Sequence, residues 1–134
     1  MNGNIIVVED DQFSQQFYQY ILKKAGYTSL VIENGDEVLA RLLQNDISLI
    51  IMDINLKNTY FRGEKIDGAF LTKYIKQKTE IKVPVILVTA HSPSIKGQEF
   101  FAETLADDFI IKPITDMYLL LGKIEILIKS YGQI

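Results

Sequence analysis

The sequence predicts an α/β fold, a doubly wound parallel sheet of five strands with helices on both of its faces. Apolar runs of strand length alternate five times with segments whose apolar residues recur at helical spacing. The run at residues 49–52, Leu-Ile-Ile-Met, has no polar face, which is typical of a strand covered on both sides. Because helical crossovers between parallel strands are right-handed, the helices should form the outer layers of a three-layer sandwich.

The first half of the chain contains three strands and two helices. The strands are predicted at residues 5–8, 27–32 and 49–53. Residues 12–25 carry a helical stripe that Gly26 is well placed to end. Asn34 and Gly35 predict the turn before the second helix. That helix has one apolar face, formed by Val38, Leu39, Leu42 and Leu43.

The second half begins with a stretch that has no pattern, at residues 57–66, which is long for a connection from a strand to a helix. The third and fourth helices are predicted from the stripes Phe70, Leu71, Tyr74 and Ile75, and Phe100, Phe101 and Leu105. A loop is predicted at residues 91–96, between the fourth strand and the fourth helix. The last two strands are predicted at residues 83–89 and 109–111. The final helix is expected at residues 115–131, with Thr115 or Asp116 as its cap.

Length and composition indicate one compact domain, residues 1–134. At 134 residues and 48% hydrophobic residues, the chain is sized for one domain with a sizeable core. The net charge of -3 provides no basic field, so nucleic acid or an anionic membrane is not expected as a direct partner. The absence of cysteine excludes disulfides, thiolate metal sites and cysteine nucleophiles. No basic region precedes the short apolar run at residues 5–8, so a cytoplasmic location is expected.

The ends of the predicted strands gather polar residues suited to phosphoryl chemistry. Parallel strands present their carboxyl ends at one edge of the sheet, and that edge receives Glu9, Asp10, Asp11, Asp53, Thr89 and Lys112. Several carboxylates at one place need a cation, and hard oxygen ligands suit Mg²⁺. A lysine and a hydroxyl can hold phosphoryl oxygens, and an aspartate can be the nucleophile that forms an acyl phosphate. Taken alone, Asp53 is equally well explained as an acid that ends a strand.

Four motifs follow the predicted strands in order. They are Ile-Ile-Val-Val-Glu-Asp-Asp at residues 5–11, Leu-Ile-Ile-Met-Asp at 49–53, Val-Ile-Leu-Val-Thr-Ala at 85–90 and Ala-Asp-Asp-Phe-Ile-Ile-Lys-Pro at 106–113. Each motif is weak alone, but together they resemble the receiver domains of the two-component response-regulator family over essentially the whole chain. The resemblance implies a single-domain response regulator with a flavodoxin-like sheet in the strand order 2-1-3-4-5.

The resemblance implies a role for each matching acid. Asp53 matches the phosphoacceptor, which takes a phosphoryl group from a phosphohistidine of a sensor histidine kinase or a histidine phosphotransfer protein. Asp10 and Asp53 would ligate Mg²⁺ directly. The backbone carbonyl of Asn55 would complete the protein ligands, and Glu9 would act through water. Asp11 is expected to cap the first helix rather than bind the metal.

The resemblance also implies a switch. Lys112 would pair with a phosphoryl oxygen, and Pro113 would follow it through a cis peptide bond. Thr89 matches the switch hydroxyl that binds the phosphoryl group, and Phe109 occupies the position of the switch aromatic residue. Phenylalanine has no hydroxyl, so its coupling would have to come from packing. The alternative is that Phe109 is only a core residue.

The stretch after the third strand departs from the family's pattern. Lys57 stands where family members commonly have proline, and several extra residues precede the next helix. Tyr60, Phe61 and Arg62 are expected to lie beside the phosphorylation edge and to contact a partner or shield the acyl phosphate; the alternative is a disordered insertion. The only histidine, His91, is expected to be a loop residue rather than a participant in the chemistry.

The favoured function is a signalling module that catalyses only its own phosphorylation and dephosphorylation and is not an enzyme acting on a metabolite. An aspartyl-phosphate phosphohydrolase is disfavoured because that class usually has an aspartate where this chain has Asn55. A flavin or nucleotide carrier is disfavoured because no glycine-rich loop follows the first strand.

The last helix is apolar on more than one face, which predicts a homodimer or an effector contact there, with a broad internal contact as the alternative. Since no output domain follows, output by protein contact or onward phosphotransfer is expected.

Overall fold

The structure, a computed structural model, describes residues 3–90 and 95–132, and within these ranges five parallel strands form the central sheet. The strands are β1 (Asn4–Val8), β2 (Thr28–Ile32), β3 (Ile47–Asp53), β6 (Val85–Thr89) and β7 (Asp108–Ile111). Their order in the sheet is β2-β1-β3-β6-β7, and every neighbouring pair is parallel. The order 2-1-3-4-5 is therefore confirmed, with β6 and β7 as the fourth and fifth strands.

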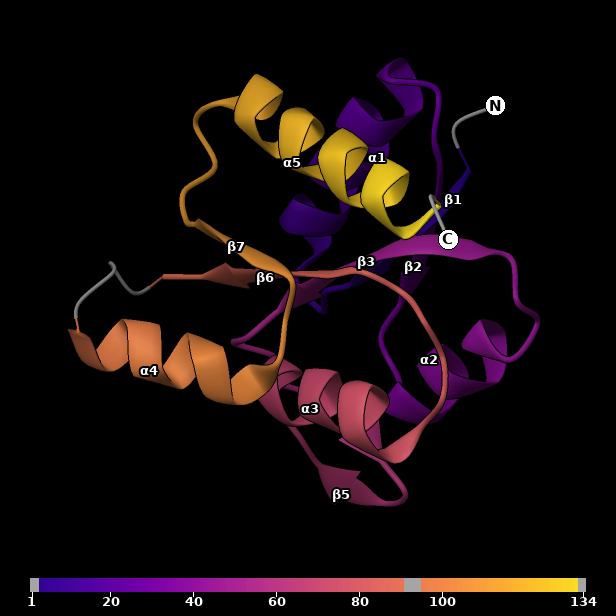
Figure 1. Ribbon diagram of the computed structural model, residues 1–134, viewed down its shortest axis with the longest axis vertical. Helices are drawn as coiled ribbons and strands as arrows, with labels where there is room; N and C mark the ends of the chain where they lie inside the picture. The colour runs from indigo at the N-terminus through magenta and orange to yellow at the C-terminus, as the bar shows by residue number, and fades with distance from the viewer. Residues whose placement is uncertain (1–2, 91–94, 133–134) are drawn as a thin grey trace.

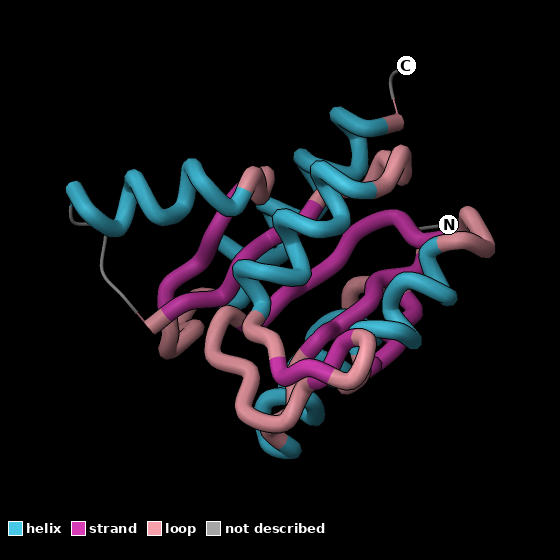
Figure 2. Tube along the Cα trace, turned by 90° about the horizontal axis from the view of Figure 1, so that it is seen from below, coloured by secondary structure: helices cyan, strands magenta, loops and turns pink. Residues whose placement is uncertain are grey.

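Helices cover both faces of the sheet (Figures 1 and 2). The helices are α1 (Gln12–Lys24), α2 (Gly35–Leu42), α3 (Gly68–Lys78), α4 (Ile95–Thr104) and α5 (Met117–Tyr131). α1 and α5 lie together on one face, and α2, α3 and α4 lie on the other (Figure 1). Alternate residues of β3 enter different cores: Leu49 and Ile51 pack towards α1 and α5, whereas Ile50 and Met52 pack towards α2 and α3. This two-sided burial is why β3 has no polar face.

Local signals determine where the helices begin and end. The carboxylate of Asp11 accepts the N–H of Ser14 at 3.0 Å and caps α1, as expected. Gly26 has a φ of 90° and ends α1 with the two backbone hydrogen bonds of a Schellman motif. At the start of α5 the cap is Asp116 and not Thr115.

The stretch after β3 forms a small hairpin, so the alternative of a disordered insertion is wrong. β4 (Tyr60–Phe61) and β5 (Glu64–Lys65) pair in antiparallel orientation. Arg62 and Gly63 between them have φ values of 52° and 80°, and positive φ at both central residues is what a type I′ turn requires. Arg-Gly is a weak form of the usual Asn-Gly signal, so the sequence did not predict these strands.

The hairpin packs onto α2 and α3, which corrects the expectation that it hangs beside the phosphorylation edge. Phe61 is 6% exposed, and its ring meets the ring of Tyr74 edge to face, with 4.8 Å between the centroids. The guanidinium of Arg62 lies over both rings, 5.0 and 5.3 Å from their centroids. The backbone N–H of Arg62 also donates to the carboxylate of Asp36 in α2, at 3.1 Å. Tyr60, by contrast, is 45% exposed.

A polar cluster at the amino ends of the strands joins α3, α5, β6 and Asp107, the residue that precedes β7. Lys76 Nζ donates to Asp107 Oδ2 at 2.7 Å, and the hydroxyl of Tyr131 donates to Asp107 Oδ1 at 2.6 Å. The N–H of Val85 donates to Asp107 Oδ2 at 2.8 Å. Burial, and then the carboxylate of Asp107, raise the pKa of Tyr131, which keeps its hydroxyl a neutral donor. The cluster therefore fixes the last turn of α5.

α5 is apolar on more than one face, as expected. Leu120 and Ile124 are fully buried. The exposed apolar residues of this helix are Met117, Tyr118, Leu119 and Ile126. A partner for this face stays a prediction. In the described ranges, none of the helices combines the length and the apolar character that a membrane span needs.

Candidate functional site

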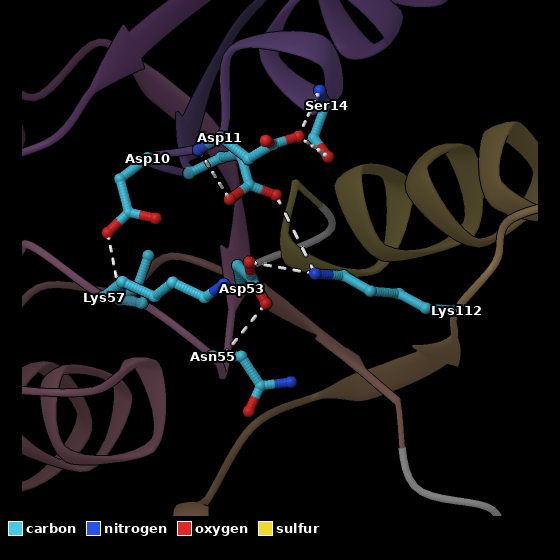
Figure 3. A pocket seen from close by; sticks show the side chains of 9 residues that line it. Asp10, Asp11, Ser14, Asp53, Asn55, Lys57 and Lys112 are labelled. Carbon is cyan, nitrogen blue, oxygen red and sulfur yellow. Dashed lines mark hydrogen bonds and ion pairs between the residues drawn. The ribbon is translucent and has the colours of Figure 1, made fainter.

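The carboxyl ends of β1, β3 and β7 surround an open pocket (Figure 3). Its volume is about 630 Å³. Its charged lining consists of Glu9, Asp10, Asp11, Asp53, Lys57 and Lys112. Thr89 ends β6, which lies between β3 and β7. The sheet thus brings together the acids and the lysine that the sequence placed at one edge, and it adds Lys57.

Asp53 lies at the floor of the pocket and is held on both carboxylate oxygens. It is the last residue of β3 and is 3% exposed. Its Oδ1 accepts the backbone N–H of Asn55 at 3.0 Å, and its Oδ2 accepts Lys112 Nζ at 3.0 Å. A carboxylate oriented by an N–H and an ammonium in this way is presented to the pocket in a fixed geometry.

Gly68 supports Asp53 from behind, which the sequence did not indicate. A Cβ at this position would overlap the backbone carbonyl of Asp53. The N–H of Gly68 donates to the carbonyl of Ile54 at 3.2 Å, and Asp67 caps α3 through the N–H of Phe70. The absence of a side chain at Gly68 allows α3 to approach the end of β3 closely.

Glu9 is a buried acid whose proton is held unusually tightly. It is 1% exposed, and burial, followed by the neighbouring Asp53 carboxylate, raises the pKa of Glu9 to about 7. Its Oε2 accepts the N–H of Asp11 at 3.2 Å. Among the described residues, its Oε1 accepts no hydrogen bond and lies 3.9 Å from Lys112 Nζ.

Asp10 is turned towards the loop that follows β3 (Figure 3). Its Oδ2 accepts the backbone N–H groups of Lys57 and Asn58, at 2.7 and 2.8 Å. The hydroxyl of Thr59 lies 3.4 Å from the same oxygen. The expected metal ligand is therefore also the anchor of the insertion, a role that requires the tertiary structure because Asp10 and Lys57 are 47 positions apart in the chain.

The pocket's donor chemistry fits a hard divalent cation. Its acids offer only oxygen, and the buried Glu9 Oε1 lacks a hydrogen-bond donor, which is the kind of atom that a hydrated cation would satisfy. In residues 3–90 and 95–132, no three His, Cys, Asp or Glu side chains are grouped tightly enough to hold an ion as they stand. Since Oδ2 of Asp10 binds the loop, Oδ1 is the oxygen that it could offer to a cation.

Lys112 and Thr89 are joined through the backbone. The N–H of Lys112 donates to the carbonyl of Thr89 at 2.7 Å, and Thr89 is 8% exposed. The peptide bond between Lys112 and Pro113 is cis, as expected.

Asp11 lines the same pocket but is exposed, and its pKa is lowered chiefly by the hydrogen bonds from Ser14, with Lys112 and Lys57 as minor causes.

Phe109 packs against α4. Its ring centroid lies 5.0 Å from that of Phe101, with 59° between the ring planes, and the side chain is partly buried. This contact is compatible with a switch residue and with a core residue, so both alternatives stay open. His91 lies outside the described residues.

Known proteins resemble this chain in sequence. The family model of the response regulator receiver domain matches residues 5–124 of this chain. The regulatory protein PhoP of Bacillus subtilis, named for alkaline phosphatase synthesis, is 29% identical over 119 residues, which are 86% of this chain and 44% of PhoP. The polar-differentiation response regulator DivK of Brucella anthropi is 29% identical over 117 residues, 86% of this chain and 88% of DivK. The chain thus spans less than half of PhoP but most of DivK.

Solved structures resemble it in fold. The receiver domain of a signal transduction histidine kinase from Syntrophus aciditrophicus has a TM-score of 0.81 and 28% identity, covering 98% of this chain and 94% of that one. The receiver domain of TorR, the response regulator of a TMAO respiratory system, has a TM-score of 0.75 and 29% identity, covering 96% and 98%.

Proposed function

The chain belongs to the response regulator receiver domain family, and we propose that Asp53 is the residue on which it carries a phosphoryl group. Membership gives the general function: this is a receiver domain of two-component signal transduction, a switch operated by phosphorylation. The observation that carries the assignment to Asp53 is its position, buried at the pocket floor between Lys112 Nζ and the N–H of Asn55. Asp11, in the same pocket, is exposed and occupied as a helix cap.

In the proposed reaction, a carboxylate oxygen of Asp53 attacks the phosphorus of a phosphohistidine. The new P–O bond forms as the P–N bond breaks, and the imidazole of the donor leaves with the electron pair. Lys112 orients the carboxylate before attack and then pairs with a phosphoryl oxygen. When bound by Asp10, Asp53 and the carbonyl of Asn55, with Glu9 acting through water, Mg²⁺ would neutralise the negative charge of the acids and of the phosphoryl oxygens.

Thr89 and Phe109 are proposed to transmit the change. The Thr89 hydroxyl would donate to a phosphoryl oxygen, and the ring of Phe109 would repack as Thr89 moves. Two contacts support this route: the backbone hydrogen bond that joins Thr89 to Lys112, and the packing of Phe109 on Phe101 of α4. A charge change at the pocket would thereby alter the α4 surface.

Intact-mass measurement after incubation with acetyl phosphate and Mg²⁺ tests the proposal. The wild type should gain one phosphoryl group, Asp53→Asn should gain none, and EDTA should abolish the gain. Asp11→Asn is the matched control, because it removes an acid from the same pocket that the proposal does not use. An unmodified wild type, or an Asp53→Asn variant modified as fast as the wild type, would refute the assignment.

The biological setting is proposed on the same basis. Residues 1–134 would form one receiver domain in the cytoplasm, which receives its phosphoryl group from a sensor histidine kinase or a histidine phosphotransfer protein. It would act on no metabolite; Asn55, where an aspartyl-phosphate phosphohydrolase usually has an aspartate, supports this. The exposed apolar residues of α5 support an effector or a second copy as the next partner.

A further inference from the structure

The acids that line the pocket outnumber the lysines, and one of the two lysines is Lys57. Four acids line it, Glu9, Asp10, Asp11 and Asp53, against two lysines. Lys112 forms ion pairs with Asp53 and Glu9, at 3.0 and 3.9 Å. Among the described residues, Lys57 Nζ forms no ion pair with any acid. Within residues 3–90 and 95–132, the ammonium of Lys57 thus lines the pocket without an ion pair, and it acts on Asp11 only as a minor electrostatic influence.

The backbone of Lys57 is held in place beside the acids. Its N–H donates to Asp10 Oδ2 at 2.7 Å, and the next N–H, that of Asn58, donates to the same oxygen. Thr59 is fully buried, and its carbonyl accepts the N–H of Ile66 at 3.0 Å, which closes the base of the hairpin. Phe61 then fixes the hairpin against Tyr74. Lys57 is therefore attached to an anchored segment and not to a free loop.

The side chain of Lys57 extends across the pocket towards Asp53 (Figure 3). Lys112 approaches Asp53 from β7, on the other side of the same carboxylate (Figure 3). A phosphoryl group on Asp53 would consequently lie between two ammonium groups that come from opposite walls of the pocket.

We propose that Lys57 is a second phosphoryl-binding cation, which attracts and holds the phosphoryl oxygens opposite Lys112. This inference rests on the proposed function of Asp53 as phosphoacceptor. The same positive charge acts against a divalent cation that binds the acids. Lys57 thus strengthens binding of the anionic group and weakens binding of the metal, so its removal changes the two in opposite directions.

Lys57→Met is the variant that tests this, with two measurements. Removing one positive charge near the acids should raise Mg²⁺ affinity about threefold to tenfold at low ionic strength, as measured by isothermal titration calorimetry. The rate of phosphorylation by acetyl phosphate at saturating Mg²⁺, followed by intact mass, should fall by a similar factor of about three to ten. Lys57→Arg keeps the charge and should stay close to the wild type in both measurements.

Lys65→Met is the matched control, because Lys65 is an exposed lysine of the same hairpin that does not line the pocket. It should leave both quantities at the wild-type level. The inference is overturned if Lys57→Met phosphorylates at the wild-type rate, if its Mg²⁺ affinity does not rise, or if Lys65→Met produces the same changes. A wild type that takes up no phosphoryl group would instead refute the role of Asp53, and the calorimetric comparison would still report whether Lys57 opposes the metal.

Discussion

Replacing Glu9 by glutamine should stabilise the metal-free protein above pH 7. In the unfolded chain Glu9 loses its proton near its ordinary pKa of 4.5, whereas in the folded protein burial and the Asp53 carboxylate raise this pKa to about 7. Between these two values the folded state binds more protons than the unfolded state, so the free energy of unfolding falls as the pH rises through this window. The difference corresponds to about 3 kcal/mol, which is fully lost above pH 7.

Glu9→Gln has nearly the same shape and no charge, so it should escape this loss. Urea unfolding in EDTA should show the variant about as stable as the wild type at pH 4.5 and more stable by up to about 3 kcal/mol at pH 7.5. Glu125→Gln is the control: Glu125 is exposed and paired with Lys129, and its replacement should change stability little. Parallel pH profiles for the wild type and Glu9→Gln would refute the reasoning, because the buried charge would then cost nothing.

Three other substitutions test the packing of the hairpin, the support of Asp53 and the polar cluster around Asp107, each by urea unfolding. Phe61→Ala should lower the free energy of unfolding by about 3 kcal/mol, because it removes a buried ring between α2 and α3. Tyr60→Ala, the control on the same strand, should lower it by less than about 1 kcal/mol. Equal losses would contradict the packing of the hairpin. Gly68→Ala should lower the free energy of unfolding by about 2 kcal/mol or more and slow phosphorylation, because the added methyl group would displace the carbonyl of Asp53. Wild-type stability and a wild-type rate would argue against this support. Lys76→Met should cost about 2 kcal/mol by leaving a largely buried carboxylate without its cation, and a cost near zero would show that the cluster is not coupled to stability.

Much of the fold could be predicted because buried apolar residues recur along the chain at the spacing of strands and helices. The apolar run of β3 and the helical stripes predicted the strands of the central sheet and the helices, whereas the strand order came from the resemblance to receiver domains. The acids and Lys112 were placed correctly at one edge of the sheet. Caps were predictable too, since Asp11 acts on a neighbour three residues away. The hairpin was missed because its turn is Arg62-Gly63, and because Phe61 is buried by helices far from it in sequence.

The sequence by itself determined which chemical groups reach the carboxyl edge of the sheet, because each follows its own strand and parallel strands end together. Only the tertiary structure decided how those groups are used. Asp10 holds the loop at Lys57 and Asn58, Gly68 makes room for the carbonyl of Asp53, and Glu9 keeps its proton to about pH 7. These properties depend on distances between residues far apart in the chain and on exclusion of water, neither of which leaves a periodic signal in the sequence.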